Sequence, residues 1–289
     1  MAAPLGEEGR LMVDTVATAT AVRIRPQGIT GERARALWAA AWPPIVFVVA
    51  VIALWELAVV ALDVPPFVIA KPTDIAAELV ASAPLLLDAT WVTTQEVLWG
   101  FVISVVVGIA IALVVVRFRW VDRAVYPLIV LFQVVPKVAL APIFILWFGY
   151  TMTPKLVLIV VMAFFPITLN MVLGLRRVDE DQLLLMRSVG STKNQILMQV
   201  QVPTSLPYLF AGARIAITLA VIGAVVAEFS GAQAGLGYLI QFSATQLDTA
   251  LMFAALIVVS VLGLFFYYLI DGVELLVRRR FPHIANAAD

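Results

Sequence analysis

Residues 176–207 read RRVDEDQLLLMRSVGSTKNQILMQVQVPTSLP and form a polar segment between two long apolar runs. The segment is too polar to lie within lipid and too regular to be a simple spacer. Three acidic residues near its start carry negative charge, which a helix dipole stabilises at the helix N-terminus: Asp179, Glu180 and Asp181. Leu185 and Val189 lie four residues apart and form an apolar pair on one helix face. We therefore predict a short amphipathic helix in the first half of the segment.

The second half of the segment carries signals for a turn and another helix. Gly190 can adopt the left-handed conformation that ends the first helix. Thr192 and Gln195 have the spacing of a capping box, which indicates the start of a second short helix. Pro203 is expected to end that helix, and Pro207 to lie in the first turn of the next apolar helix. The prediction is helix, glycine turn, helix, between two membrane spans.

The composition of the chain is that of a membrane protein. Hydrophobic residues make up 63% of it, charged residues only 13%, and the mean hydropathy is +1.02. Acidic and basic side chains are equal in number, so no net field attracts nucleic acid. The absence of Cys and a lone His283 near the C-terminus exclude disulfides, thiolate metal sites and imidazole ligands within the membrane. The fold class we predict is all-α and polytopic.

The apolar runs predict six membrane helices. They cover approximately residues 44–62, 94–116, 124–148, 156–175, 207–229 and 250–270. Pro127, Pro136 and Pro142 interrupt the third run, which is expected to be kinked or broken. An amphipathic stretch at residues 73–82 predicts a short helix at the outer surface.

The distribution of Lys and Arg sets the orientation. Almost all of them lie in the two tails, in the segment after the second span and in residues 176–207, whereas the outer segments hold only Lys71 and Lys155. The positive-inside rule then places both termini and residues 176–207 in the cytoplasm. We expect residues 1–40 to be a mostly disordered cytoplasmic tail, residues 41–275 to be a transmembrane domain, and residues 276–289 to be a cytoplasmic C-terminal tail.

Residues 176–207 resemble the cytoplasmic coupling loop, or EAA loop, of the permease subunits of bacterial ABC importers. In that family a Gly is followed, after nine residues, by an aliphatic residue, a spacer, an aliphatic residue and Pro. Gly190, Val200, Val202 and Pro203 occupy these positions here. The Glu-Ala-Ala of the family is replaced by Leu184, Leu185 and Met186. The residues that the resemblance implies for contact with an ATPase are Asp179, Glu180, Leu184, Leu185, Met186, Val189, Gly190, Ile196, Val200, Val202 and Pro203.

Two membrane stretches extend the resemblance to most of the chain. VVPKVALAPIFILWFG at 134–149 and LAVIGAVVAEFSGAQAGLGYLI at 219–240 are similar to permeases of the nitrate, sulfonate and taurine group, which also includes pyrimidine, thiamine-precursor and flavin-type transporters. The resemblance implies a type I ABC importer fold and alternating access in a bacterial cytoplasmic (inner) membrane. It also implies a homodimer, two separate ATPase subunits that bind ATP and Mg, and an extracytoplasmic solute-binding protein. The chain itself would carry no cofactor.

Charged residues within the spans are candidates for the solute pathway. A charge within the membrane costs about 3 kcal/mol unless it faces a cavity or a partner. Lys137 is expected to face the pathway and favour an anionic or carbonyl-bearing solute, to pair with Glu228 or Glu56, or to extend to the membrane surface. Glu228 is a candidate for a gate, a binding-protein contact or a solvated rim residue, and Glu96 can be solvated. Glu56 is expected to face protein, and Arg214 to extend to the surface or pair within protein.

The sequence offers no residues for enzyme chemistry. Gly231, Gly235 and Gly237 are not preceded by a strand or followed by a Lys-Ser/Thr pair, which favours an outer re-entrant turn over a nucleotide site. The spans contain neither a nucleophile with a base nor metal ligands. The alternative function is a secondary transporter or channel that acts without an ATPase. Such a protein needs a relay of ionisable groups, and the few charges in these spans are scattered.

Overall fold

The computed structural model describes residues 29–280 and is helical throughout its regular structure. The chain divides into two compact units, residues 1–54 and residues 55–289, which we describe separately. Helix α2 (Ile29–Ala61) begins in the first unit and contains Pro43 and Pro44. Residues 29–40, which the sequence assigned to the tail, are helical in α2. Residues 1–28 of the predicted N-terminal tail and residues 281–289 of the C-terminal tail lie outside the described residues.

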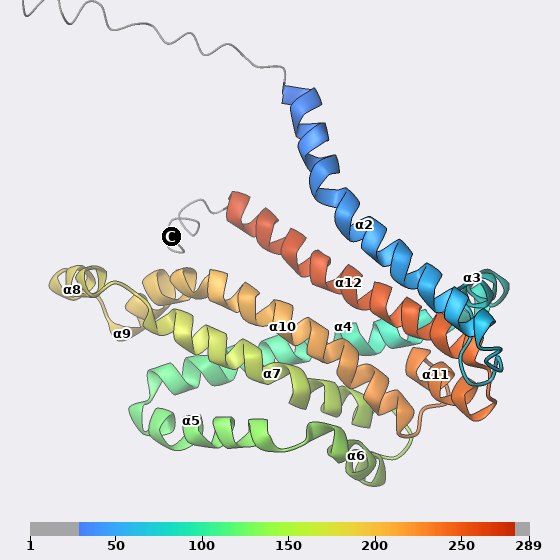
Figure 1. The fold of residues 1–289 in the computed structure, drawn as a ribbon. Coiled ribbons are helices and arrows are strands. Elements are labelled where there is room, and N and C mark those ends of the chain that lie inside the picture. The colour runs from blue at the N-terminus through green and yellow to red at the C-terminus, as the bar shows by residue number, and fades with distance from the viewer. Residues whose placement is uncertain (1–28, 281–289) are drawn as a thin grey trace, which may run out of the picture. The chain divides into compact units, whose positions relative to one another are not determined.

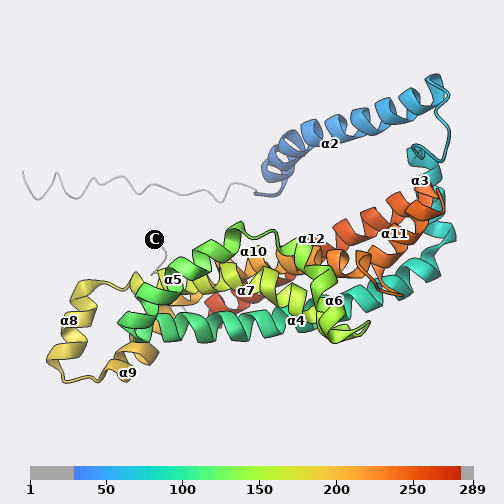
Figure 2. The same ribbon diagram turned by 90° about the horizontal axis from the view of Figure 1, so that it is seen from below.

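The second unit consists of long helices joined by short ones (Figures 1 and 2). Its elements are α3 (Pro72–Ala81), α4 (Ala83–Arg117), α5 (Arg119–Val134), the 3₁₀ turn η1 (Lys137–Leu140), α6 (Ala141–Phe148), α7 (Met152–Arg176), α8 (Glu180–Ser188), α9 (Lys193–Ile196), the π turn η2 (Leu197–Gln201), α10 (Val202–Phe229), α11 (Leu236–Thr245) and α12 (Thr249–Arg280). In both views α8 and α9 lie at the end of this unit opposite to α3 and α11.

Helix α7 forms the centre of the second unit and packs against both α4 and α10. Glycines allow these helices to approach closely: a Cβ at Gly100 of α4 would collide with Ile159 of α7. A Cβ at Gly212 of α10 would lie 2.7 Å from the carbonyl oxygen of Pro166 in α7. The buried residues Ile159, Ile167 and Ile217 belong to the core cluster that these contacts enclose. Helix pairing in this unit therefore depends on small residues at the crossing points.

Replacing Gly212 with alanine is expected to destabilise the protein by about 1–3 kcal/mol, because the methyl group would overlap a backbone oxygen that cannot rotate away. Gly272→Ala is the matched control, since a Cβ at this position in α12 meets nothing within 4 Å. The control should be neutral, or stabilising by up to about 1 kcal/mol through the higher helix propensity of alanine. The thermal unfolding midpoints of the two variants in detergent measure the difference. Equal midpoints would contradict the close packing of α7 and α10.

Within residues 29–280, five helices are long and apolar enough to cross a membrane: residues 42–61 of α2, α4, α7, residues 193–229 and α12. The predicted third span corresponds to α5, η1 and α6 instead of one continuous helix. Val135 and Pro136 are extended between α5 and η1, as expected for a run broken by proline. The prediction of a broken third run is therefore confirmed. In place of the six predicted membrane helices, the described residues contain five long spanning helices and one shorter apolar stretch, Lys137–Phe148.

Several predicted boundaries differ from the structure. Helix α4 begins at Ala83 and α12 continues to Arg280, so both are longer than their apolar cores. Helix α11 follows the Gly-rich turn and was not predicted. The polar end of α12 continues the helix beyond the part that hydropathy detects, whereas α11 is a separate helix within the predicted outer segment.

The prediction that Pro203 ends the second short helix is wrong. Helix α9 passes through the π turn η2 directly into α10, with Pro203 in the first turn of α10 and Pro207 inside that helix. Pro203 lies at the second residue of α10. A proline is tolerated there because the first backbone N–H groups of a helix form no intrahelical hydrogen bond, so the missing N–H of proline costs none. The hydroxyl of Thr204 donates to the Val200 carbonyl at 2.7 Å, so the turn keeps side-chain hydrogen bonds around the proline. The result is a continuous helical connection from the loop into the membrane helix.

Candidate functional site

The first helix of the predicted coupling loop forms as its sequence indicates. The Asp179 side chain caps α8 by accepting a hydrogen bond from the Asp181 backbone N–H at 3.1 Å. At the other end, Gly190 has φ +78° and its N–H donates to the Arg187 carbonyl at 3.0 Å. This left-handed glycine ends the helix, which confirms the predicted turn. A Cβ built on Gly190 meets nothing within 4 Å, so the backbone conformation and not crowding favours glycine here.

The second helix begins at the predicted capping box. The Thr192 hydroxyl accepts from the Gln195 N–H at 3.3 Å, and Gln195 Oε1 accepts from the Thr192 N–H at 2.7 Å. Both bonds of the motif are present. The turn between α8 and α9 is therefore held by local hydrogen bonds on both sides of Gly190.

The apolar residues of the loop separate into an exposed and a buried set. We define the loop patch as the four apolar residues that are between 59% and 69% exposed: Leu184, Leu185, Val189 and Met198. Ile196 and Leu197 are buried, and Met186, Val200, Val202 and Pro203 are partly buried. The polar candidates Asp179 and Glu180 are exposed. The structure thus divides the candidate contact residues into those that face outward and those that anchor the loop.

Two polar contacts and one apolar cluster connect the loop to the membrane helices. Gln201 donates from Nε2 to the Leu175 carbonyl at the end of α7, at 3.1 Å. Arg176, the last residue of α7, pairs with Asp122 of α5 at 2.5 Å. Leu197 packs in a cluster with Leu175 and other residues of α4 and α7. The loop is therefore in direct contact with α7 and continuous with α10.

A buried polar cluster lies at the other end of α10. Glu228 is 1% exposed, which excludes the interpretation of this residue as a solvated rim residue. Its Oε1 accepts from the Thr93 hydroxyl at 2.7 Å, and its Oε2 accepts from the Gly237 N–H at 2.5 Å. Thr93 Oγ1 in turn accepts from the Leu236 N–H at 2.9 Å. Glu228 therefore joins α10 to α4 and to the first turn of α11.

Glu96 belongs to the same region and is also buried, so its solvated interpretation is wrong. Its Oε1 lies 2.5 Å from Nζ of Lys155 in the first turn of α7. Its Oε2 has no hydrogen-bond partner among the residues that the structure describes. The carboxyl groups of Glu96 and Glu228 interact electrostatically with each other and with Lys155. We call Thr93, Glu96, Lys155, Glu228 and Gly237 the Glu228 cluster.

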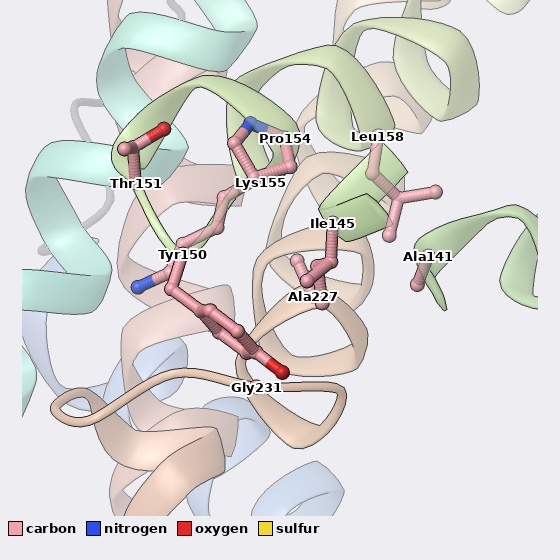
Figure 3. Close-up of a pocket in the computed structure, with 9 residues that line it drawn as sticks. All are labelled: Ala141, Ile145, Tyr150, Thr151, Pro154, Lys155, Leu158, Ala227 and Gly231. Carbon is pink, nitrogen blue, oxygen red and sulfur yellow. The ribbon is translucent and has the colours of Figure 1, made fainter. Parts of the chain in front are cut away.

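A cavity of about 320 Å³ lies beside the Glu228 cluster. Its lining residues come from α4, from the start of α7 and from the turn before α11: Val92, Gln95, Glu96, Tyr150, Thr151, Met152, Lys155, Gly231, Ala232, Gln233 and Ala234. Figure 3 shows the neighbouring smaller pocket, where Tyr150 lies close to Gly231. Gly235, with φ +115°, has the Glu228 carboxyl group against it, where a side chain would collide. The Gly-rich turn thus forms the wall of a cavity and encloses a buried carboxylate.

The other charged candidates do not meet in one site. Glu56 accepts two hydrogen bonds from Thr73, at 3.1 Å from its N–H and 2.8 Å from its hydroxyl, and so caps the start of α3. Lys137 forms no ion pair with any residue that the structure describes, so the predicted pairing with Glu228 or Glu56 is not observed.

Arg214 pairs within the protein, as one of its two interpretations expected. Its guanidinium lies 2.9 Å from Asp271 and 2.8 Å from Glu274 of α12, and Glu274 also pairs with Arg278 at 2.7 Å. Sequence analysis did not single out Asp271 and Glu274, nor Thr93 and Lys155 of the Glu228 cluster. In the sequence, each of these residues is a polar side chain within or beside an apolar run. This pattern indicates that the side chain needs a partner in the fold but does not identify which residue it pairs with.

Comparison with known proteins identifies the family. Residues 104–279 match the family described as binding-protein-dependent transport system inner membrane component. The chain is 36% identical to the formylaminopyrimidine transport permease protein ThiX of Halalkalibacterium halodurans over 80% of this chain and 92% of the relative. It is 31% identical to the riboflavin transport system permease protein RibX of Chloroflexus aurantiacus over 86% and 94%.

The fold is also similar to that of a solved transporter. A chain of the inward-facing MetNI methionine ABC transporter superposes with a TM-score of 0.61 at 20% identity, covering 68% of this chain and 98% of that one. The family match extends from the middle of α4 to the last turn of α12 and includes the whole predicted coupling loop. The chain therefore belongs to the binding-protein-dependent transport system inner membrane components, and it is a permease subunit of an ABC importer and not an enzyme.

Proposed function

We propose that two copies of this chain form the membrane part of an ATP-driven importer in a bacterial cytoplasmic membrane, with two ATPase subunits on the cytoplasmic side and a solute-binding protein outside. The observation that carries this proposal is the loop patch. Four large apolar side chains project from a short loop that is held by caps and hydrogen bonds. Exposed apolar residues gathered in this way mark a surface for another protein.

The structure supports a lever mechanism for this loop. Burying a large apolar side chain stabilises a contact by roughly 1.5–3 kcal/mol, so each residue of the loop patch would contribute to holding a partner. When the ATPase pair closes around ATP, the loop would move with it, and the Gln201 and Arg176 contacts would carry this motion to α7, α10 and α5. Rigid helices that shift together can switch a pathway between inward-open and outward-open packings.

The finer topology is also part of the proposal. The broken stretch α5, η1 and α6 would make the third of six crossings, so that both termini and the loop lie in the cytoplasm. The Glu228 cluster would then lie near the outer surface, where its cavity is accessible to a solute or to the binding protein. Glu56 and Arg214 would support neighbouring helices, because their charged groups are already bonded to Thr73, Asp271 and Glu274.

For the solute we propose a small organic heterocycle rather than nitrate or an aliphatic sulfonate such as taurine. The two relatives described above are named for formylaminopyrimidine and riboflavin, which are both flat nitrogen heterocycles. This choice concerns the transported molecule only. The coupling of transport to ATP does not depend on it.

The test is to express this chain with the ATPase encoded beside it and to measure ATP hydrolysis of the purified pair in lipid. We expect co-purification, and stimulation of hydrolysis when the neighbouring binding protein is loaded with its heterocycle. Leu185→Asp in the loop patch should abolish co-purification, because it places a charge in an apolar contact. Val80→Asp is the matched control, since Val80 is also apolar and exposed but lies in α3 at the opposite end of the second unit. Solute movement down an ion gradient by the chain alone would overturn the proposal.

A further inference from the structure

The cavity of about 320 Å³ beside the Glu228 cluster exposes polar as well as apolar surface. The Gln95 side chain of α4 and the Gln233 side chain of the turn before α11 line it from opposite elements. Neither side-chain amide forms a hydrogen bond with any residue that the structure describes. A glutamine amide supplies two donors and an acceptor. The two amides therefore offer groups of both kinds to a ligand in the cavity.

Lys155 adds a charged donor to the same cavity. Its side chain is 16% exposed, lines the cavity, and donates from Nζ to Glu96 Oε1. An ammonium group has three N–H donors, and the described residues supply an acceptor for one of them. A donor that is largely withdrawn from water is destabilising when it has no acceptor. The remaining N–H groups of Lys155 therefore favour a ligand that brings an oxygen acceptor.

The charges around the cavity decide which acceptor is favoured. Glu96 and Glu228 are both buried, and both interact electrostatically with Lys155. Two carboxyl groups thus surround one ammonium group. Even with one carboxyl group protonated, the three side chains together carry no net positive charge. An anionic ligand therefore gains no net attraction here, whereas a carbonyl oxygen can accept from Lys155 without adding a negative charge.

We propose that this cavity is an outer solute site of the permease that accepts a small, uncharged heterocycle with hydrogen-bonding groups and rejects anions. A carbonyl oxygen of the solute accepts from Lys155 Nζ, and the amides of Gln95 and Gln233 bond to its ring nitrogens or N–H groups. Tyr150 lines the same cavity and offers an aromatic surface to the ring. The volume lies at the lower end of the range of roughly 300–1,000 Å³ found for ligand pockets, which suits a single small ring system.

The inference rests on the proposed import function and adds a physical reason for its choice of solute. Nitrate or an aliphatic sulfonate brings a full negative charge to a region that already holds two carboxyl groups. An acidic side chain of the binding protein meets the same repulsion. A lipid acyl chain would leave the two amides and the ammonium group without hydrogen-bond partners. An uncharged solute with both donors and acceptors satisfies these groups without either cost.

The test measures direct binding of radiolabelled formylaminopyrimidine to the permease–ATPase complex in lipid nanodiscs without the binding protein. The wild-type complex is expected to bind it, and orotate, a pyrimidine that carries a carboxylate, should not compete. Gln95→Leu should weaken binding roughly threefold to tenfold, as expected for one lost hydrogen bond. Its unfolding midpoint should stay close to that of the wild type, because the amide bonds to no described residue. Gln246→Leu is the matched control, since Gln246 is exposed at the end of α11 and does not line the cavity.

Glu96→Gln tests the selection by charge separately. It removes one negative charge at nearly constant side-chain volume, so the affinity for orotate should rise roughly tenfold while that for formylaminopyrimidine changes little. Glu228→Gln makes the same change of charge from α10 and replaces this test if Glu96→Gln does not fold. Glu180→Gln removes an exposed charge in α8 and should leave orotate excluded. A purely structural role of the buried carboxyl groups would not raise the affinity for an anion.

Three results would overturn the site. They are lack of wild-type binding, equal binding by Gln95→Leu and the wild type, and competition by orotate that is the same in the wild type and in the folded glutamine variants of Glu96 and Glu228. The proposed function fails by a different result, which is that no loaded binding protein stimulates ATP hydrolysis.

Discussion

Replacing Gly190 with valine is expected to uncouple ATP hydrolysis from transport while the membrane helices remain folded. Gly190 has φ +78°, a conformation that costs an ordinary L-residue about 1–2 kcal/mol and a β-branched residue more. Valine would force the turn between α8 and α9 into another conformation and change the angle at which the loop patch is presented. We expect uptake and solute-stimulated hydrolysis to fall by roughly tenfold or more, since 1.4 kcal/mol corresponds to a factor of ten.

Gly190→Asn is the matched control for this substitution. Asparagine adopts the left-handed conformation more readily than other residues with a side chain, and the space around Gly190 is open to 4 Å. The asparagine variant should therefore retain most of the stimulated activity, and the membrane helices of both variants should remain folded. The rate of ATP hydrolysis in reconstituted complexes, measured with and without loaded binding protein, distinguishes the valine variant from the asparagine variant. Wild-type stimulation in Gly190→Val would show that the glycine turn does not set the coupling geometry.

Replacing Glu228 with alanine is expected to lower stability by about 3 kcal/mol or more. The change leaves the Gly237 N–H without its buried acceptor, and an unsatisfied donor costs about 1–3 kcal/mol. It also removes the 2.7 Å hydrogen bond of the Thr93 hydroxyl, which keeps the Ala89 carbonyl as an acceptor. It also leaves Lys155 and Glu96 beside an empty space. The first turn of α11 should loosen before the rest of the unit, because Gly237 is held there by Glu228. Hydrogen exchange of residues 231–240 and the thermal midpoint measure these two effects.

Glu228→Gln tests whether the stability of the cluster depends on the hydrogen-bond acceptors of Glu228 or on its negative charge. Glutamine keeps one carbonyl oxygen for the Gly237 N–H and fills the same volume, so its loss of stability should be clearly smaller than that of the alanine variant. Glu180→Ala in α8 is a control for removing a glutamate at an exposed position and should leave the midpoint nearly unchanged. Equal destabilisation by Glu228→Ala and Glu180→Ala would show that the buried cluster does not hold α11.

Local signals allowed the coupling loop to be predicted from the sequence nearly residue by residue. The cap at Asp179, the left-handed Gly190 and the capping box of Thr192 and Gln195 all depend on residues within four positions of one another. The broken third run was predictable for the same reason, since Pro136 acts on its own backbone. Pro203 was misjudged because whether a proline ends a helix depends on the turn before it, and here that turn is a π turn.

The sequence by itself determined that the chain is a helical membrane protein with a capped, glycine-hinged loop between two spans, because hydropathy and caps are properties of neighbouring residues. Only the tertiary structure decided which polar side chains meet. Thr93 and Glu228 are 135 residues apart, Glu96 and Lys155 are 59 apart, and Arg214 and Asp271 are 57 apart. Within an apolar environment each buried charge or hydroxyl requires a partner, but helix packing brings that partner from elsewhere in the chain. The same packing gives Lys137 no carboxylate partner among the residues that the structure describes.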